Sequence, residues 1–325
     1  MSRAFVDPRG CKLRANAVNA FPIWNDPVRP AVDGGDYRLI REKGFRVVRL
    51  VMPWSWYEPQ PGQWRNIELL DQSIAMARGA GLYVILDPIH LHPTLPLPSW
   101  ATGSDSVEAV RTHARRWIQF VANRYRSDPT VAAYDLFNEP DPVDQNRVLR
   151  MYNEMIGWVR EVDPAKIVMT SSPWGNSSMA PQFADAALLT QRTNVVHTFH
   201  DYYAGDGNGS TVSNGYNAQG SVTGDFTLDN DFTGYKTTAD EPDFAAQLGV
   251  QVDFSRRADV PMWIGEFGIA ANAGNATAWV DQKIALYERL GLGRAWWMYK
   301  CGGALALLTS TCQWEPIAAH LRASG

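Results

Sequence analysis

The sequence predicts an α/β fold, a single (β/α)8 TIM barrel, from three observations. Apolar stretches of strand length alternate about eight times with amphipathic stretches of helix length. The 325 residues suffice for one barrel, which typically takes about 250 residues and tolerates insertions. No Gly-rich turn follows the first strand, as a competing doubly wound sheet would require. Since no linker interrupts the alternation, we expect one domain over residues 1–325.

The expected strands are short apolar runs, and the fourth shows best how they end. In Val131–Pro140 the run closes in Asn138, Glu139 and Pro140. Proline cannot donate to a strand ladder and disfavours helix at the residue before it, so this strand should stop there. The eight expected strands are Leu13–Asn19, Val47–Met52, Leu82–Asp87, Val131–Pro140, Ile167–Thr170, Val195–His200, Met262–Glu266 and Arg294–Tyr299.

The expected helices carry their apolar residues at helical spacing and stop at glycine or proline signals. In Val107–Tyr125, for example, Val110, Trp117 and Val121 belong to one apolar stripe. The expected helices are Asp36–Lys43, Ile67–Arg78, Val107–Tyr125, Arg147–Val162, Pro181–Leu189, Pro242–Arg257, Ala276–Leu290 and Glu315–Arg322.

The alternation is interrupted once, after the sixth strand. Residues 203–240 are rich in Gly, Asn, Asp, Ser and Thr, with Tyr216, Phe226, Phe232 and Tyr235 scattered through them. A connection of this length is either functional or partly disordered, and we expect a loop on the catalytic face. Its acidic residues lack the ligand spacing of a calcium loop, so we expect no metal there.

Composition excludes several classes of function. The net charge is −4 without a block of Lys or Arg, which argues against nucleic acid or an anionic membrane as partner. No stretch approaches the roughly 18 apolar residues of a membrane span. The first residues lack the apolar core of a signal peptide. We therefore expect a mature secreted protein, with a cytoplasmic one as the alternative, and a monomer.

The sequence contains three cysteines, and their spacing leaves two interpretations open. Cys301 and Cys312 bracket a short Gly- and Leu-rich connection that a disulfide could close. The alternative is that all three, including Cys11, are buried thiols.

Polar and aromatic residues gather at the carboxyl ends of the expected strands, where α/β barrels place catalytic groups. A pair of glutamates on two strand ends is what glycoside hydrolysis needs. The 13 tryptophans also favour a carbohydrate partner, because sugar rings stack on aromatic faces. The candidate site residues are Arg49, His90, Asn138, Glu139, His200, Tyr202, Glu266 and Trp297.

These motifs together resemble glycoside hydrolase family 5, the cellulase-like barrels with glutamates on strands four and seven. The matching stretches are Val48–Leu50, Ile85–His90, Asn138–Pro140, His200–Tyr202, Gly265–Gly268 and Trp296–Lys300. The resemblance implies a retaining β-glycosidase without cofactor or metal, in which Glu139 is the acid/base and Glu266 the nucleophile. It also implies that the other six candidates shape the sugar subsite next to the scissile bond. The long 203–240 segment departs from typical cellulases.

The chemistry of these roles sets two electrostatic expectations. Glu266 must be ionised to attack the anomeric carbon, and Arg49 with the Tyr202 hydroxyl would stabilise its anion. Glu139 must hold a proton near neutral pH, and we expect the charge of Glu266 to raise its pKa. A retaining mechanism places the two carboxyl groups ~5–5.5 Å apart.

Several alternatives remain open. Small β-glycosides or β-glucan oligosaccharides are the expected substrates, with polymeric β-1,4-glucan or β-mannan as the alternative. A transglycosylase would use the same residues. A metal-dependent amidohydrolase-type barrel could draw ligands from His90, His92, His197 and His200. A sugar-binding barrel without catalysis is the last alternative, although both glutamates are present.

Overall fold

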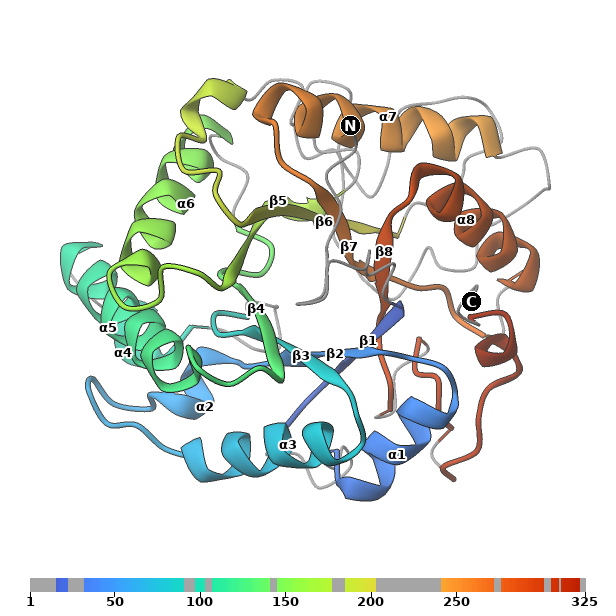
Figure 1. Cartoon of the computed structure of the whole chain (residues 1–325), viewed down its shortest axis with the longest axis horizontal. Helices are drawn as coiled ribbons and strands as arrows, with labels where there is room; N and C mark the ends of the chain where they lie inside the picture. Colours follow the sequence, from blue (N-terminus) through green and yellow to red (C-terminus); the bar gives the residue numbers. More distant parts are fainter. Residues whose placement is uncertain are drawn as a thin grey trace.

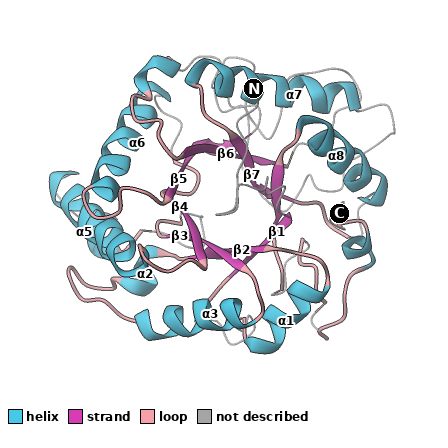
Figure 2. Ribbon diagram, in the orientation of Figure 1, coloured by secondary structure: helices cyan, strands magenta, loops and turns pink. Residues whose placement is uncertain are grey.

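Eight parallel strands close into a barrel in the order β1 to β8, with helices on the outside (Figures 1 and 2). The structure is a computed structural model that describes residues 16–22, 32–90, 97–102, 107–140, 145–176, 185–202, 241–271, 276–300, 305–309 and 311–321. The strands are β1 (Asn16–Ala20), β2 (Val47–Val51), β3 (Tyr83–Asp87), β4 (Val131–Asp135), β5 (Ile167–Asn176), β6 (Val195–Asp201), β7 (Met262–Phe267) and β8 (Gly293–Trp296). The predicted (β/α)8 barrel is confirmed.

The helices lie around the barrel wall (Figure 2). They are α1 (Gly34–Glu42), α2 (Trp54–Tyr57), α3 (Ile67–Gly79), α4 (Ser99–Thr102), α5 (Val107–Tyr125), α6 (Gln145–Arg160), α7 (Glu241–Ala258) and α8 (Ala276–Leu290), with 3-10 turns Ala186–Leu188 and Pro316–Ala319. The start of α1 shows why a helix begins there, because Asp33 caps the amides of Gly35 and Asp36. The expected closing helix Glu315–Arg322 is wrong for the described residues up to 321, where the 3-10 turn Pro316–Ala319 forms instead.

The inside of the barrel is built in layers because strand side chains alternate with period two. One inward-facing layer takes one apolar residue from each strand, and all eight are buried: Ala17, Val47, Ile85, Ala133, Met169, Val196, Trp263 and Ala295. Two residues further along four of these strands stand Asn19, Arg49, Asp87 and Asp135, also fully buried. These four residues form a polar layer that lies directly above the apolar layer.

The fourth strand ends earlier than the sequence predicts. β4 stops at Asp135, so Asn138 and Glu139 lie in a bend beyond the strand. The Asn138 amide donates to the Ile89 carbonyl at 2.8 Å, and the Tyr152 hydroxyl of α6 donates to the Phe137 carbonyl at 2.8 Å. These bonds to the neighbouring loop and helix hold the bend at the barrel mouth.

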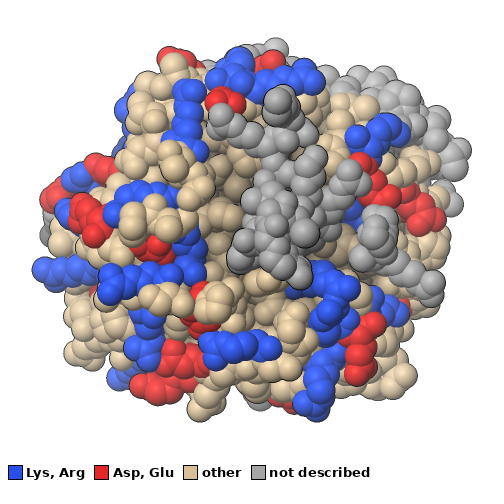
Figure 3. Space-filling view, in the orientation of Figure 1, with Lys and Arg blue, Asp and Glu red and all other residues tan. Residues whose placement is uncertain are grey.

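Charged side chains are interspersed over the face shown in Figure 3. Ion pairs also link α5 to α6 and to the residue after it, namely Arg111 with Glu154 and Arg115 with Glu161 at 2.6 Å. Among the helices of the described ranges, none combines the length and the apolar character needed to span a membrane.

Candidate active site

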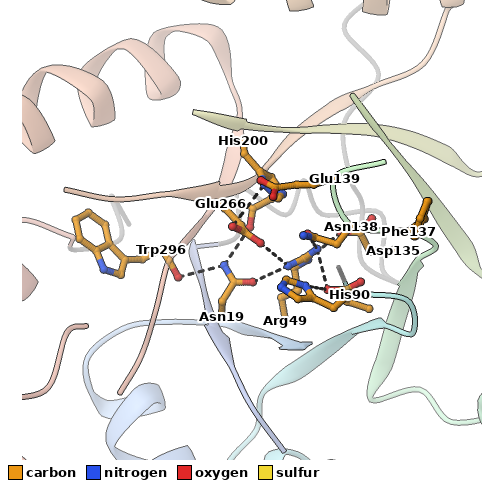
Figure 4. Close-up of polar contacts among 12 residues, drawn as sticks. Asn19, Arg49, His90, Asp135, Phe137, Asn138, Glu139, His200, Glu266 and Trp296 are labelled. Carbon is orange, nitrogen blue, oxygen red and sulfur yellow. Dashed lines mark hydrogen bonds and ion pairs between the residues drawn. The ribbon is translucent and has the colours of Figure 1, made fainter. Parts of the chain in front are cut away.

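Arg49 is the centre of the polar layer (Figure 4). Its Nε donates to Asp135 Oδ2 at 2.8 Å, and its Nη1 donates to Glu266 Oε1 at 3.0 Å. Its Nη2 donates to Asn138 Oδ1 at 2.8 Å and lies 3.1 Å from Asp87 Oδ2. The side chain is fully buried, so one guanidinium faces several carboxylates in a place where water does not screen them.

Glu266 receives donors from two sides. Besides Arg49 on Oε1, the Tyr202 hydroxyl donates to Oε2 at 2.7 Å, and His200 Nδ1 lies 3.4 Å from Oε2. These are the two anion-stabilising partners that the sequence analysis expects, Arg49 and Tyr202, with His200 added. The carboxylate is therefore buried and also provided with a cation and a hydroxyl donor.

Glu139 lies across the site from Glu266 in an unusual backbone conformation. Its φ is +46°, a left-handed region that glutamate seldom adopts and that neighbouring structure must hold in place. Its Oε1 shares a hydrogen bond of 2.7 Å with His200 Nδ1. Carboxylate oxygens of Glu139 and Glu266 lie within 4.8 Å of each other. This spacing is close to that of retaining glycosidases and far below the ~6.5–9.5 Å of inverting ones.

Burial is the main reason why both glutamates hold their protons more strongly than usual. It raises the pKa of Glu139 to about 8, and that of Glu266 to about 7, where His200 and Arg49 oppose it. We expect the charge of Glu266 to raise the pKa of Glu139, but the leading cause is desolvation of the Glu139 carboxyl group. The guanidinium of Arg49 and the hydroxyl of Tyr202 on Glu266 favour the charge there and leave the proton on Glu139.

The remaining candidates form an aromatic side of the site. The rings of His90 and Trp297 are stacked, with centroids 5.5 Å apart and an angle of 2°. His90 Nδ1 lies 2.6 Å from Asp87 Oδ2, and burial holds the pKa of His90 well below its usual value, so the ring is neutral. Trp297 follows directly after β8, and Phe21 packs edge-on against it at 6.0 Å.

Three residues of the site escape the sequence analysis: Asn19, Asp87 and Asp135. Asn19 donates to the Gly265 and Trp296 carbonyls at 3.1 and 3.2 Å and accepts from Arg49 at 3.0 Å. Each lies two residues after an apolar residue of the inner layer, but in strands buried on both faces this alternation does not show which residues point inward.

The described histidines His90, His197 and His200 do not assemble as an amidohydrolase-type metal site. His197 Nε2 is 3.0 Å from Gln251 Oε1 of α7, and its ring packs on Phe254 at 4.6 Å, on the outside of the barrel. His92 lies outside the described residues. Among those that are described, one group has metal-ligand spacing, namely Glu139, His200 and Glu266. The Arg49 cation bonded to Glu266 opposes a second cation there.

The described cysteine fits neither interpretation of the sequence. Cys312 is an exposed free thiol. Cys11 and Cys301 lie outside the described residues, as does the 203–240 segment.

Comparisons with known proteins agree with this geometry. The family model described as "Cellulase (glycosyl hydrolase family 5)" matches residues 6–302. Among curated proteins, Endoglucanase C of Acetivibrio thermocellus is 21% identical over 294 residues, covering 82% of this chain and 83% of the relative.

Solved structures share the fold. The lactosyl-enzyme intermediate of endo-glycoceramidase II from Rhodococcus sp. matches with a TM-score of 0.75 and 18% identity, covering 98% of this chain and 80% of that one. A structure described as an endoglucanase matches with a TM-score of 0.72 and 18% identity, covering 95% and 97% of the two chains.

Proposed function

This chain belongs to glycosyl hydrolase family 5, the cellulase family, and is a retaining glycoside hydrolase of β-glycosidic bonds; from that premise we propose which side chains carry the reaction. Glu266 is the nucleophile and Glu139 is the general acid/base. The observation that supports these roles best is the asymmetry of their partners. Glu266 has a guanidinium and a hydroxyl donor, whereas Glu139 has only His200 within hydrogen-bond distance among the described residues.

The reaction follows from this asymmetry in two steps. Glu266 attacks the anomeric carbon while Glu139 gives its proton to the leaving oxygen, and a glycosyl ester forms on Glu266. Esterification removes the charge of Glu266, so the pKa of Glu139 falls. The ionised Glu139 then takes a proton from water, which attacks the ester.

The other candidates hold the sugar in this proposal. Asn138, oriented by Arg49 at 2.8 Å, contacts the 2-hydroxyl, where a hydrogen bond strengthens in the transition state. Trp297, braced by His90, forms the floor on which the sugar ring stacks.

The test of the nucleophile is covalent trapping. A 2-deoxy-2-fluoro β-glycoside with a dinitrophenyl leaving group should inactivate the enzyme with one burst of dinitrophenol, and peptide mapping should place the label on Glu266. Glu266→Gln is the control and should take up no label. Label on any other residue, or a product of inverted configuration by NMR, would overturn the assignment.

For the substrate we propose β-glucan-type oligosaccharides or small β-glycosides, with endo-action on β-1,4-glucan or β-mannan as the alternative. The similarity to proteins described as endoglucanases supports a β-glucan. A panel of aryl β-glycosides, cello-oligosaccharides, mannan and cellulose tests this choice. Higher kcat/KM on polymer than on every oligosaccharide would favour the endo-acting alternative. The monomeric state and the secreted location stay predictions.

A further inference from the structure

The end of β6 carries two of the groups that touch the glutamates, yet the strand ladder is irregular there. Phe199 pairs with Ile264 but His200 pairs with Glu266, so Gly265 is skipped on β7. On the other side the β5–β6 register shifts between Ser171 and Asn176. Because ladder hydrogen bonds are disrupted at such bulges, the ladder alone does not hold the end of β6 rigidly.

A buried ion pair with α8 supplies the missing anchor. Lys283 Nζ donates to Asp201 Oδ1 at 2.8 Å, and the Tyr287 hydroxyl donates to Asp201 Oδ2 at 2.7 Å. The side chains of Asp201 and Lys283 are both completely buried. Asp201 stands between His200 and Tyr202, and strand alternation points its side chain away from the barrel interior, towards α8.

The helix that provides this anchor is itself fixed against the neighbouring strand. Lys283 Nζ lies 5.3 Å from the centre of the Trp279 ring. The rings of Trp279 and Tyr287 pack on Phe267 of β7, with centroids 6.4 and 5.4 Å from it. Phe267 is the residue directly after Glu266 and pairs with Asp201. The same helix therefore contacts the strand of Glu266 and the strand of its partners.

We propose that Lys283, Tyr287 and Asp201 form a positioning cluster that sets the Tyr202 hydroxyl against the Glu266 carboxylate. The cluster touches neither substrate nor the reacting atoms, and it acts through Tyr202 and His200. This inference rests on the proposed role of Glu266 as the ionised nucleophile. Buried ion pairs can often be replaced by apolar residues without loss of stability. The Lys283–Asp201 pair lies next to Tyr202, so we assign it to positioning the Tyr202 side chain and not to stabilising the fold.

The measurable consequence lies in the acid limb of the pH dependence of kcat/KM, which reports Glu266 in the free enzyme. The groups that face Glu266 are Arg49 of β2, His200 and Tyr202 at the end of β6, and Glu139 beyond β4. When the Tyr202 hydroxyl moves away, the Glu266 anion loses a donor and the pKa of Glu266 rises. A loss of stability elsewhere in the barrel leaves this limb in place.

The experiment compares acid limbs on a 2,4-dinitrophenyl β-glycoside. Tyr202→Phe should move the limb upward by about one pH unit, the size expected for one hydrogen bond to a charged group. Tyr287→Phe and Lys283→Met should each move it in the same direction by roughly half as much, since the bond is lengthened and not removed. In Tyr202→Phe/Tyr287→Phe the second change should add no further shift, because both act through one hydroxyl.

The matched control is Tyr134→Phe. Tyr134 is also a buried tyrosine that donates to an aspartate, Asp163 at 3.0 Å, but its hydroxyl contacts this residue before β5 and the Ala122 carbonyl of α5, neither of which belongs to the candidate site. It should lower the melting temperature and leave the limb unmoved. Should Lys283→Met not fold, Asp201→Asn/Lys283→Met removes both charges and takes its place.

The outcomes separate the two levels of inference. If Tyr202→Phe moves the limb while Tyr287→Phe and Lys283→Met leave it unmoved, the positioning role is overturned and the assignment of Glu266 stands. If Tyr202→Phe itself leaves the limb unmoved, the assignment of Glu266 fails and the positioning role fails with it. Additive shifts in the double variant would also overturn it.

Discussion

At the scale of single residues, neighbours decide what two identical side chains do. Glu266 is a buried and Glu139 a partly buried carboxylic acid, and both have raised pKa values. Arg49 contacts Glu266 directly at 3.0 Å, and Tyr202 adds a second donor at 2.7 Å. Glu139 has no such pair of donors among the described residues, so it is the better proton holder.

The proposed role of Glu139 as acid predicts that the loss of activity depends on the leaving group. Glu139→Ala should slow glycosylation by roughly 10²–10⁴-fold for alkyl or sugar leaving groups, because these need a proton. With a dinitrophenyl leaving group the burst rate should change far less. Pre-steady-state kinetics on the two substrate classes measures both values. Equal losses in the burst phase would show that another group supplies the proton.

The alkaline limb of the pH dependence of kcat/KM provides a second test of Glu139. The proposed mechanism needs protonated Glu139, so kcat/KM should fall as the pH rises through its pKa of about 8. In Glu139→Ala, measured on the dinitrophenyl substrate, this limb should disappear.

At the scale of elements, β7 brings its glutamate into the site through a close approach at Gly265. A Cβ at Gly265 would lie 2.6 Å from Thr198 Oγ1 and 3.0 Å from His200 Nε2. A side chain here would therefore force Thr198 to move and would crowd the histidine that contacts Glu139. Glycine at this position is a requirement of the packing between β6 and β7.

Gly265→Ala should accordingly reduce kcat by about tenfold or more while destabilising the fold by ~1–3 kcal/mol. Thr198→Ala removes the nearest obstructing atom, so Gly265→Ala/Thr198→Ala should recover part of the lost activity. Gly249→Ala on α7, where a Cβ meets nothing within 4 Å, is the control and should leave kcat unchanged. Steady-state kinetics and thermal melts are the measurements. A fully active Gly265→Ala would contradict the role given to this contact.

At the scale of the whole molecule, the polar layer connects several strands of the barrel and also lowers its free energy of unfolding. Arg49 bonds to groups from β1, β4 and β7 as well as to Asn138. Burial raises the pKa of Asp87 to about 6 and also raises that of Asp135. Buried acids that must ionise at neutral pH reduce the free energy of unfolding.

Glu139 allows a test of how far the ionisation of such a carboxyl group destabilises the protein. Its pKa rises from the model-compound value of 4.5 to about 8 on folding, so the folded state binds the proton more tightly. The stabilisation from this proton is complete below pH 4.5 and is lost as the pH rises towards 8. Glu139→Gln keeps the shape of the protonated acid, so it should stabilise the protein by about 1–2 kcal/mol at pH 8.

Melting temperatures across the pH range measure this effect. The gain in Glu139→Gln should be a few degrees at pH 8 and should vanish near pH 4.5. Glu68→Gln on the exposed face of α3 is the control and should show no such trend. A gain independent of pH would show that the carboxylate charge is not its cause.

The sequence by itself determined the order of strands and helices, the closed barrel and the two glutamates. These follow from local apolar periodicity and from short motifs at strand ends. It did not determine the end of β4, because the chain leaves the sheet at Asp135 through bonds to Ile89 and Tyr152, which are distant in sequence. Nor did it reveal Asn19, Asp87 and Asp135, since strands buried on both faces carry no sign of which side faces inward.

The electrostatics were decided only by the tertiary structure. His197 and His200 are three residues apart on one strand, yet one contacts α7 and the other contacts Glu139. Arg49 reaches Glu266 across 217 positions of sequence. The pKa of a carboxyl group depends on its burial and on charges a few ångströms away in space, and barrel closure alone brings those charges together.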